Sequence, residues 1–206
     1  MLRNPNGLSY AVVALLAVTA VLDVIAVLAA LALRGEPWAE GQADLTVALL
    51  SLVQLLLYVA TVVLWIVWFH RTRLNAEVWA PAEHSRTTGW AIGAWFIPFA
   101  NLWIPRNIAA EIWRASRPDP SAPDASGELR LLNGWWTLFV LENVADRIAS
   151  RLYDKAETAD AYVDAASWLA VSNALNLAAA VLAILFVRKL TSMQHLKATG
   201  MISAAQ

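Results

Sequence analysis

The amino-acid sequence predicts an all-α fold: an integral membrane four-helix bundle with a proline-broken re-entrant or interfacial segment between the second and third spans. Composition is the first observation behind this prediction, because 59% of the 206 residues are hydrophobic and 15% are charged, against about 25% charged in soluble domains. A chain of this length cannot place so many apolar side chains in a core of its own, so lipid must be part of its solvent. The second observation is that four long apolar runs alternate with polar segments. We therefore expect residues 1–206 to form a single membrane domain.

The first two predicted spans cover residues 8–33 and 45–69. The first run is apolar apart from one serine at its start, one threonine and Asp23, and it is too long for the apolar region of a signal peptide, which has about 7–15 residues. The second run carries no charge, and Trp65 and Trp68 near its end are residues typical of the membrane interface. Both runs are long enough to cross a bilayer as helices, which takes about 20 residues.

The third and fourth predicted spans cover residues 131–148 and 168–187. The third begins apolar and turns polar from Glu142 onward, whereas the fourth is uncharged until Arg188 ends it. Just before the third span, residues 117–127 hold three prolines and several small polar residues. This composition predicts a flexible linker.

Residues 90–105 are apolar, carry no charge and include two prolines. Because a spanning helix needs about 20 residues and a proline inside a helix removes a backbone hydrogen bond, this stretch is too short and too broken for a comfortable crossing. From Pro105 onward the pattern predicts an amphipathic helix with Ile112 and Trp113 on its apolar side. Residues 90–116 are therefore expected to form the re-entrant or interfacial segment, and a tilted, kinked crossing is the alternative.

The distribution of basic residues separates these topologies, because cytoplasmic segments of membrane proteins are enriched in Lys and Arg. If residues 90–105 do not cross, eleven basic residues lie on the side of both termini and four on the other side. If they cross, the division becomes seven and eight. The first arrangement obeys the rule, so we expect a multi-pass protein of the plasma membrane with both termini in the cytoplasm.

A motif rich in tryptophan lies in the broken segment: residues 93–105 read GAWFIPFANLWIP, and residues 111–116 read EIWRAS. It resembles the signature of the domain-of-unknown-function 4328 family, actinobacterial membrane proteins with about four spans, and the resemblance extends from the second span to the last. The resemblance implies a location and an architecture. Since the family has no established activity, no catalytic residue is carried over. The motif residues are Trp95, Phe96, Pro98, Asn101, Pro105 and Trp113.

Several polar residues are predicted to lie within the spans. Asp23 and Arg147 are each about 15 or 16 residues from the cytoplasmic end of their span, so a rise of about 1.5 Å per residue puts them at one height in the outer half of the membrane. An unpaired charge at that depth costs at least about 2.5 kcal/mol, and the two are therefore expected to pair. The candidate buried polar cluster comprises Asp23, Gln54, Glu142, Asn143, Asp146, Arg147, Asn173 and Asn176.

This cluster has two interpretations that the sequence leaves open. It can line a cavity for an ion, a proton relay or a small ligand, or it can supply interhelical hydrogen bonds worth about 0.6–2 kcal/mol each. Asn101 likewise lies either at the hinge of an interfacial anchor or at the edge of a site. Glu142 and Asp146 have a spacing compatible with acid–base chemistry, but no nucleophile accompanies them, and we do not expect an enzyme.

Charge and residue types set the expected partners. The net charge of −1 gives no electrostatic support for nucleic-acid binding. The chain has no cysteine and no histidine pair at metal-binding spacing, so no metal or cofactor is expected. Membrane lipid is the expected partner, including anionic headgroups on the cytoplasmic face, although the same arginines also fit ordinary topology bias. The arginines in question are Arg71, Arg73, Arg86, Arg106, Arg114 and Arg117.

The expected function is therefore that of a non-enzymatic membrane scaffold or regulatory component. Such a component would act with an unknown protein partner or with a second copy of the chain. The alternative is a channel or transporter subunit that uses the buried polar residues.

Overall fold

The computed structural model of this chain describes residues 2–32 and 40–204, and every element in those residues is helical. The long helices are α1 (Asn6–Ala32), α2 (Glu40–Trp79), α5 (Arg130–Asp154) and α6 (Ala159–Ala204). Between α2 and α5 lie the short helices η1 (Pro81–Glu83), α3 (Trp90–Gly93), η2 (Ala100–Leu102) and α4 (Ile104–Ala115). The prediction of an all-α fold is confirmed.

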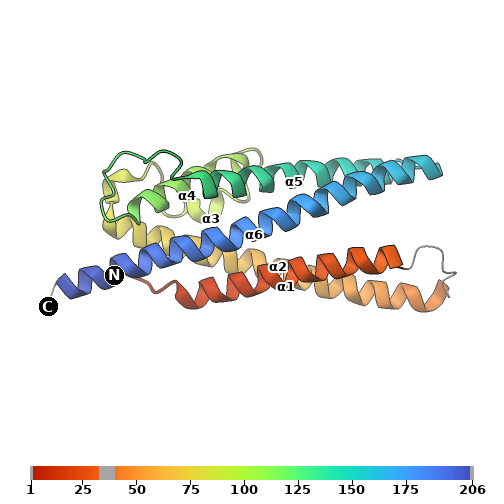
Figure 1. The fold of residues 1–206 in the computed structure, drawn as a ribbon, viewed down its shortest axis with the longest axis horizontal. Coiled ribbons are helices and arrows are strands. Elements are labelled where there is room, and N and C mark those ends of the chain that lie inside the picture. The colour runs from red at the N-terminus through yellow and green to blue at the C-terminus, as the bar shows by residue number, and fades with distance from the viewer. Residues whose placement is uncertain (1, 33–39, 205–206) are drawn as a thin grey trace.

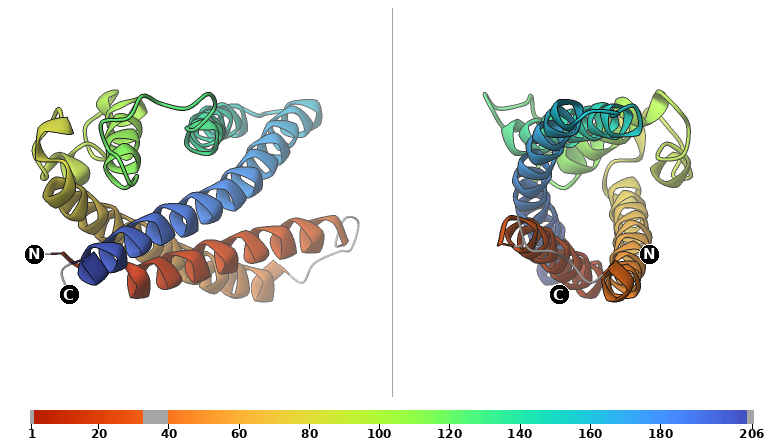
Figure 2. Two further views of the ribbon diagram at one scale, coloured as in Figure 1. Left: turned by 60° about the vertical axis from the view of Figure 1, so that its left-hand side comes forward. Right: turned by 90° about the vertical axis from the view of Figure 1, so that its right-hand side faces the viewer.

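The long helices run side by side, and α1 and α2 are antiparallel neighbours, as are α5 and α6 (Figure 1). Helix α6 packs against both α5 and α1, with α5 the more extensive partner, and Figure 2 shows it running obliquely between them. Both termini lie at the same end of the long helices as α3 and α4 (Figure 1). The segment between α2 and α5 therefore leaves and returns at one end of the molecule.

Three helices of the described chain are long and apolar enough to cross a membrane, judged by length and composition: α1 over Asn6–Ile25, α2 over Leu52–Trp79 and α6 over Asp160–Gly200. Helix α5, which contains the third predicted span, is not among them. Its second half carries Asp146 and Arg147, and these charges interrupt the apolar run.

The helices are longer than the apolar runs from which the spans were predicted. Helix α2 continues past Phe69 to Trp79, and α6 continues past Val187 to Ala204. An apolar run ends at the first polar residue, whereas a helix can continue through polar residues. Helix α2 continues to Trp79 and ends there because Pro81, two residues later, cannot continue it. The last residue of the first predicted span lies outside the described residues.

Nine aromatic rings form one connected group near the end of the molecule that holds α3 and α4, which we call the aromatic cluster. The centroids of the Trp65 and Trp135 rings are 5.0 Å apart, and Trp135 stacks on Phe186 at 5.2 Å. These contacts join α2, α5 and α6, and ring pairs at such distances stabilise packing beyond the area they bury. The members are Trp65, Trp68, Phe69, Trp95, Trp113, Trp135, Trp136, Phe139 and Phe186.

A buried polar layer lies beyond the aromatic cluster, on the side of the termini. The Gln194 side-chain amide donates to the Thr72 carbonyl at 3.0 Å and to Ser116 Oγ at 3.2 Å, while its oxygen accepts from Asn75 Nδ2 at 3.0 Å. Asn75 also accepts from the backbone N–H of Arg3 at 2.7 Å. One glutamine therefore links α6 to α2 and to the end of α4, and its partner Asn75 holds the N-terminal segment.

The loop before α3 is fastened to α4 by Glu111. Ser85 Oγ donates to Glu111 Oε1 at 2.6 Å, and the Nδ1 atom of the buried His84 lies 3.5 Å from Glu111 Oε2. Burial alone would raise the pKa of Glu111, but the contact with His84 and the hydrogen bonds from Ser85 outweigh it, and the pKa lies below the ordinary value. The ionised carboxylate thus stabilises the folded chain.

We predict that Glu111→Gln lowers the free energy of unfolding in detergent by about 1–3 kcal/mol at neutral pH, the range for a hydrogen bond to a charged group. Because the pKa is depressed in the folded state, the stabilisation is present above the ordinary pKa of 4.5 and lost as the pH falls below it. Thermal unfolding of both proteins at pH 7 and pH 4 should show a smaller difference at pH 4. Glu83→Gln, at an exposed neighbouring position, is the matched control, and an equal effect of both changes would contradict the prediction.

Candidate functional site

The motif segment between α3 and α4 contains a strained turn. Ala100 N–H donates to the Pro98 carbonyl at 2.7 Å, and Phe99 between them has φ 64° and ψ −47°. This geometry is a γ-turn with positive φ, which is rare for a residue with a side chain and costs about 1–3 kcal/mol. The turn reverses the chain so that Asn101 N–H returns to the Ile97 carbonyl at 3.1 Å.

Two further contacts hold the segment after the turn. Trp136 Nε1 on α5 donates to the Leu102 carbonyl at 2.8 Å. Trp103 is the N-cap residue of α4, and Pro105 lies in the first turn of that helix. N–H groups in the first turn have no acceptor within the helix, so the missing N–H of a proline costs no hydrogen bond there. Asn101 is thus positioned by its own backbone bond to Ile97 and by the bond from the Trp136 side chain to the next residue.

A cavity of about 380 Å³ opens beside this segment, within the range of about 300–1,000 Å³ for small-molecule sites. Six of its thirteen lining residues are aromatic: Tyr58, Trp65, Trp95, Phe96, Trp135 and Phe139. Its polar lining residues are Thr61, Asn101 and Asn143, and its aliphatic ones are Leu16, Val62, Ile66 and Ala183. We call this the aromatic cavity.

The polar side chains that line the aromatic cavity are neutral, and several have unused hydrogen-bonding capacity. The Asn101 side-chain amide makes no hydrogen bond to a described residue, and the buried Trp65 Nε1–H in the wall has no partner there either. Asn143 Nδ2 donates to the Phe139 carbonyl at 2.8 Å and to Glu142 at 2.9 Å, so its oxygen stays available. The cavity therefore offers donors and acceptors without a charge.

The structure brings three residues of the predicted polar cluster together at a second place. Asp23 Oδ1 accepts from Gln54 Nε2 at 2.9 Å, and Asp23 Oδ2 accepts from Asn176 Nδ2 at 3.1 Å. One carboxylate thereby joins α1, α2 and α6. The amides satisfy both of its oxygens.

The other members of the predicted cluster lie elsewhere. Asn143 lines the aromatic cavity, Glu142 accepts from Asn143 but does not line the cavity, and Asn173 is half-buried on α6 without a hydrogen bond to the described part of the chain. Asp146 and Arg147 are exposed, and the pair predicted between Asp23 and Arg147 is not formed by these two described residues. The prediction rested on the equal depth of the two residues in the membrane. In the structure Arg147 lies on an exposed face of α5, and the Asp23 carboxylate instead accepts hydrogen bonds from two amides.

Sequence reasoning missed the buried polar layer. Thr72, Asn75 and Gln194 lie beyond the ends of the predicted spans, in stretches read as loops or tails. The available signal was helical spacing, because Thr72 and Asn75 are three residues apart and continue one face of the second span.

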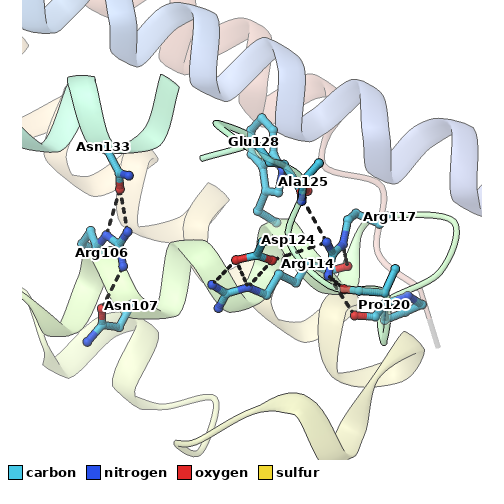
Figure 3. A network of polar contacts seen from close by, with 11 residues as sticks. Arg106, Asn107, Arg114, Arg117, Pro120, Asp124, Ala125, Glu128 and Asn133 are labelled. Atoms are coloured by element: carbon cyan, nitrogen blue, oxygen red, sulfur yellow. Dashed lines mark hydrogen bonds and ion pairs between the residues drawn. The ribbon is translucent and has the colours of Figure 1, made fainter. Parts of the chain in front are cut away.

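All six arginines expected to bind anionic lipid have partners within the protein, and Figure 3 shows three of them. Arg114 donates to Asp124 at 2.8 Å, Arg117 to Glu128 at 3.0 Å and Arg106 to Asn133 at 2.6 Å. The hydrogen bond from Arg114 holds the pKa of Asp124 below its ordinary value. The remaining three also contact protein groups: Arg71 the Asn4 carbonyl, Arg73 both Glu77 and the Arg86 carbonyl, and Arg86 Ser85.

Arg117 also forms hydrogen bonds within residues 117–127. The sequence predicts a flexible linker there, whereas in the structure Arg117 donates to the carbonyls of Pro120 and Ala122 at 3.0 and 2.8 Å (Figure 3). The loop is closed around one guanidinium, which composition alone does not reveal. In the part of the chain that the structure describes, no three His, Asp or Glu side chains are grouped as a metal site would require.

We predict that Asp23→Ala lowers the free energy of unfolding in detergent by about 1–3 kcal/mol, since it removes two intramembrane hydrogen bonds of about 0.6–1.7 kcal/mol each. Arg147→Gln, a change at an exposed residue of similar predicted depth, should leave the stability within about 0.5 kcal/mol. Equilibrium unfolding in mixed detergent micelles measures both. A larger loss of unfolding free energy for Arg147→Gln than for Asp23→Ala would contradict this prediction and support the ion pair between Asp23 and Arg147.

Comparison with known proteins bears on the family of this chain. A family model described as a domain of unknown function (DUF4328) matches residues 32–192. No curated protein and no solved structure matches the chain. The family match covers well over half of the 206 residues and confirms the resemblance carried by the motif: the chain belongs to the DUF4328 family.

Proposed function

We propose that this chain is a bacterial, multi-pass protein of the plasma membrane that crosses four times, through α1, α2, α5 and α6, with both termini in the cytoplasm. The common end of the termini, α3 and α4 supports this placement (Figure 1). That end also receives eleven of the fifteen basic residues, in agreement with the positive-inside rule.

Helix α5 is the fourth crossing in this proposal. With 25 residues it is long enough to span, and it packs along α6. Its first half contributes three rings to the aromatic cluster, and the charged residues of its second half approach the outer end at Asp154. Residues 90–116 then lie on the cytoplasmic side, as a re-entrant or interfacial segment.

Cysteine accessibility tests this topology, because the native chain has no cysteine and needs no background replacement. We predict that a membrane-impermeant maleimide labels Ser121→Cys only in inside-out vesicles, since the loop after α4 is cytoplasmic. The same reagent should label Glu157→Cys, between α5 and α6, in intact cells. Labelling of Ser121→Cys from outside would overturn the four-span placement.

We further propose that the protein is a non-enzymatic scaffold or regulatory component whose aromatic cavity binds a neutral amphipathic molecule from the membrane. The observation that carries this is the cavity beside the strained motif turn, walled by rings and lined by amides with free hydrogen-bonding groups. A strained residue beside a cavity is typical of binding sites. The lining favours binding over catalysis, because its polar groups are amides and hydroxyls.

The chemistry of the lining indicates the class of ligand. Among the residues that the structure describes, no Asp, Glu, Lys or Arg lines the aromatic cavity, so a charged headgroup would lose its hydration without gaining a counter-charge. Asn101 can donate to an ester carbonyl, and the free oxygen of Asn143 can accept from a hydroxyl. A neutral lipid with a hydroxyl and ester groups, such as a diacylglycerol, meets both requirements.

A photoactivatable diacylglycerol with a diazirine in one acyl chain tests this proposal in nanodiscs that contain the full chain. We expect adducts at cavity-lining residues, and Asn101→Phe, which fills the cavity, should reduce them about 10-fold. Leu102→Phe adds the same ring at the next, exposed residue, which does not line the cavity, and should leave the adducts within about 2-fold. Equal adduct formation in both variants would show that the probe samples only surrounding lipid.

A channel or transporter subunit is the second candidate function, and the carboxylate of Asp23 held between two amides favours it, because ionisable groups within membranes mark ion and proton paths. Flux of ions or small solutes into proteoliposomes that depends on Asp23 would replace the scaffold proposal.

A further inference from the structure

A groove of about 410 Å³ lies between the start of α1 and the C-terminal part of α6. Helix α1 contributes Asn6, Ser9 and Tyr10 to its walls, and α6 contributes Arg188, Ser192 and His195. The groove is separate from the aromatic cavity, since the two share no lining residue. Its polar groups include a permanent cation, an imidazole, an amide and four hydroxyls.

Arg188 differs from the six arginines considered above. Each of those donates to a carboxylate, an amide, a hydroxyl or a backbone carbonyl. Arg188 is exposed and makes no hydrogen bond or ion pair with any described residue. Its five N–H donors are therefore free for a ligand, and their planar fork suits a phosphate better than a point charge does.

The groove lies at the boundary between apolar and polar parts of both helices. The uncharged run of α6 ends at Val187, directly before Arg188. On α1 the groove begins at Asn6, two residues before the apolar run that starts at Leu8. Tyr10 is 75% exposed, and tyrosine is enriched at membrane interfaces. In the proposed topology this boundary faces the cytoplasmic leaflet.

We propose that this groove binds the phosphate of an anionic phospholipid, with the headgroup at Arg188 and the acyl chains along the apolar faces of α1 and α6. Ser192 donates to the phosphate oxygens beside the guanidinium. His195, whose Nδ1 is 3.5 Å from Asn6 Nδ2, closes the polar end of the groove. Basic pockets between membrane helices on the cytoplasmic side are suited to such headgroups. The assignment rests on the proposed membrane placement of α1 and α6.

The neighbouring residue provides a matched control. Lys189 is also basic and exposed but does not line the groove. Arg188→Gln and Lys189→Gln therefore remove the same charge from adjacent positions, and only the first removes it from the groove. Ser192→Phe fills the groove and keeps both charges.

Native mass spectrometry of the full chain in detergent measures this, with phosphatidylglycerol as the anionic probe and phosphatidylcholine as the zwitterionic one. We expect phosphatidylglycerol to bind preferentially, Arg188→Gln and Ser192→Phe to weaken it about 5- to 10-fold, and Lys189→Gln to weaken it less than 2-fold. Equal losses in Arg188→Gln and Lys189→Gln, or equal binding of both lipids, would overturn the assignment.

Two further arms separate the sources of failure. Displacement of the lipid by millimolar inorganic phosphate would assign the groove to a free phosphate ion and overturn the lipid proposal. Cysteine labelling reports the topology independently: if Ser121→Cys is labelled from outside, the membrane placement is wrong, whereas correct labelling with no lipid preference refutes the groove alone.

Discussion

Stacking of aromatic rings around Trp135 is the interaction on which the remaining structure depends. Its ring lies 5.0 Å from that of Trp65 on α2 and 5.2 Å from that of Phe186 on α6. In lipid, burial of apolar surface gives little net drive for helix association, so close packing must supply it. Large rigid rings do so at one level of the helices. The same rings then set the distance between α2 and α5, and this distance leaves the aromatic cavity open.

The packing of the aromatic cluster explains how the strained turn at Phe99 is maintained. A positive φ at a phenylalanine persists only where surrounding structure over-determines it. Trp95, before the turn, packs against rings of α2 and α5, and Trp136 holds the Leu102 carbonyl after it. The motif therefore places two tryptophan contacts and a proline around one unfavourable residue, and the result is an asparagine amide directed by its backbone to the wall of a cavity.

The all-α class, three apolar helices and the family could be predicted from the sequence because each depends on local composition or on a contiguous motif. The partners of Asp23 could not. Counting residues from a span end gives the height of a side chain but not its direction around the helix axis, so Arg147 and the amides of Gln54 and Asn176 were indistinguishable as partners. Gln194 was missed for another reason, since apolar runs mark the membrane and not the ends of the helices.

In a regulatory protein, a ligand bound in the aromatic cavity must affect a surface that a protein partner can contact. A series of packed side chains runs from the cavity to such a surface. Trp135 lines the aromatic cavity and stacks on Phe186, which stacks in turn on Trp113 at 6.0 Å. Trp113 Nε1 donates to Glu128, and Glu128 accepts from Arg117, the residue that closes the loop over 117–127. A ligand that displaces Trp135 must disturb this series or be resisted by it, because close-packed interiors transmit strain. Three rings and two charge-assisted hydrogen bonds thus form a continuous series of contacts between the cavity and the arginine-closed loop on the proposed cytoplasmic side.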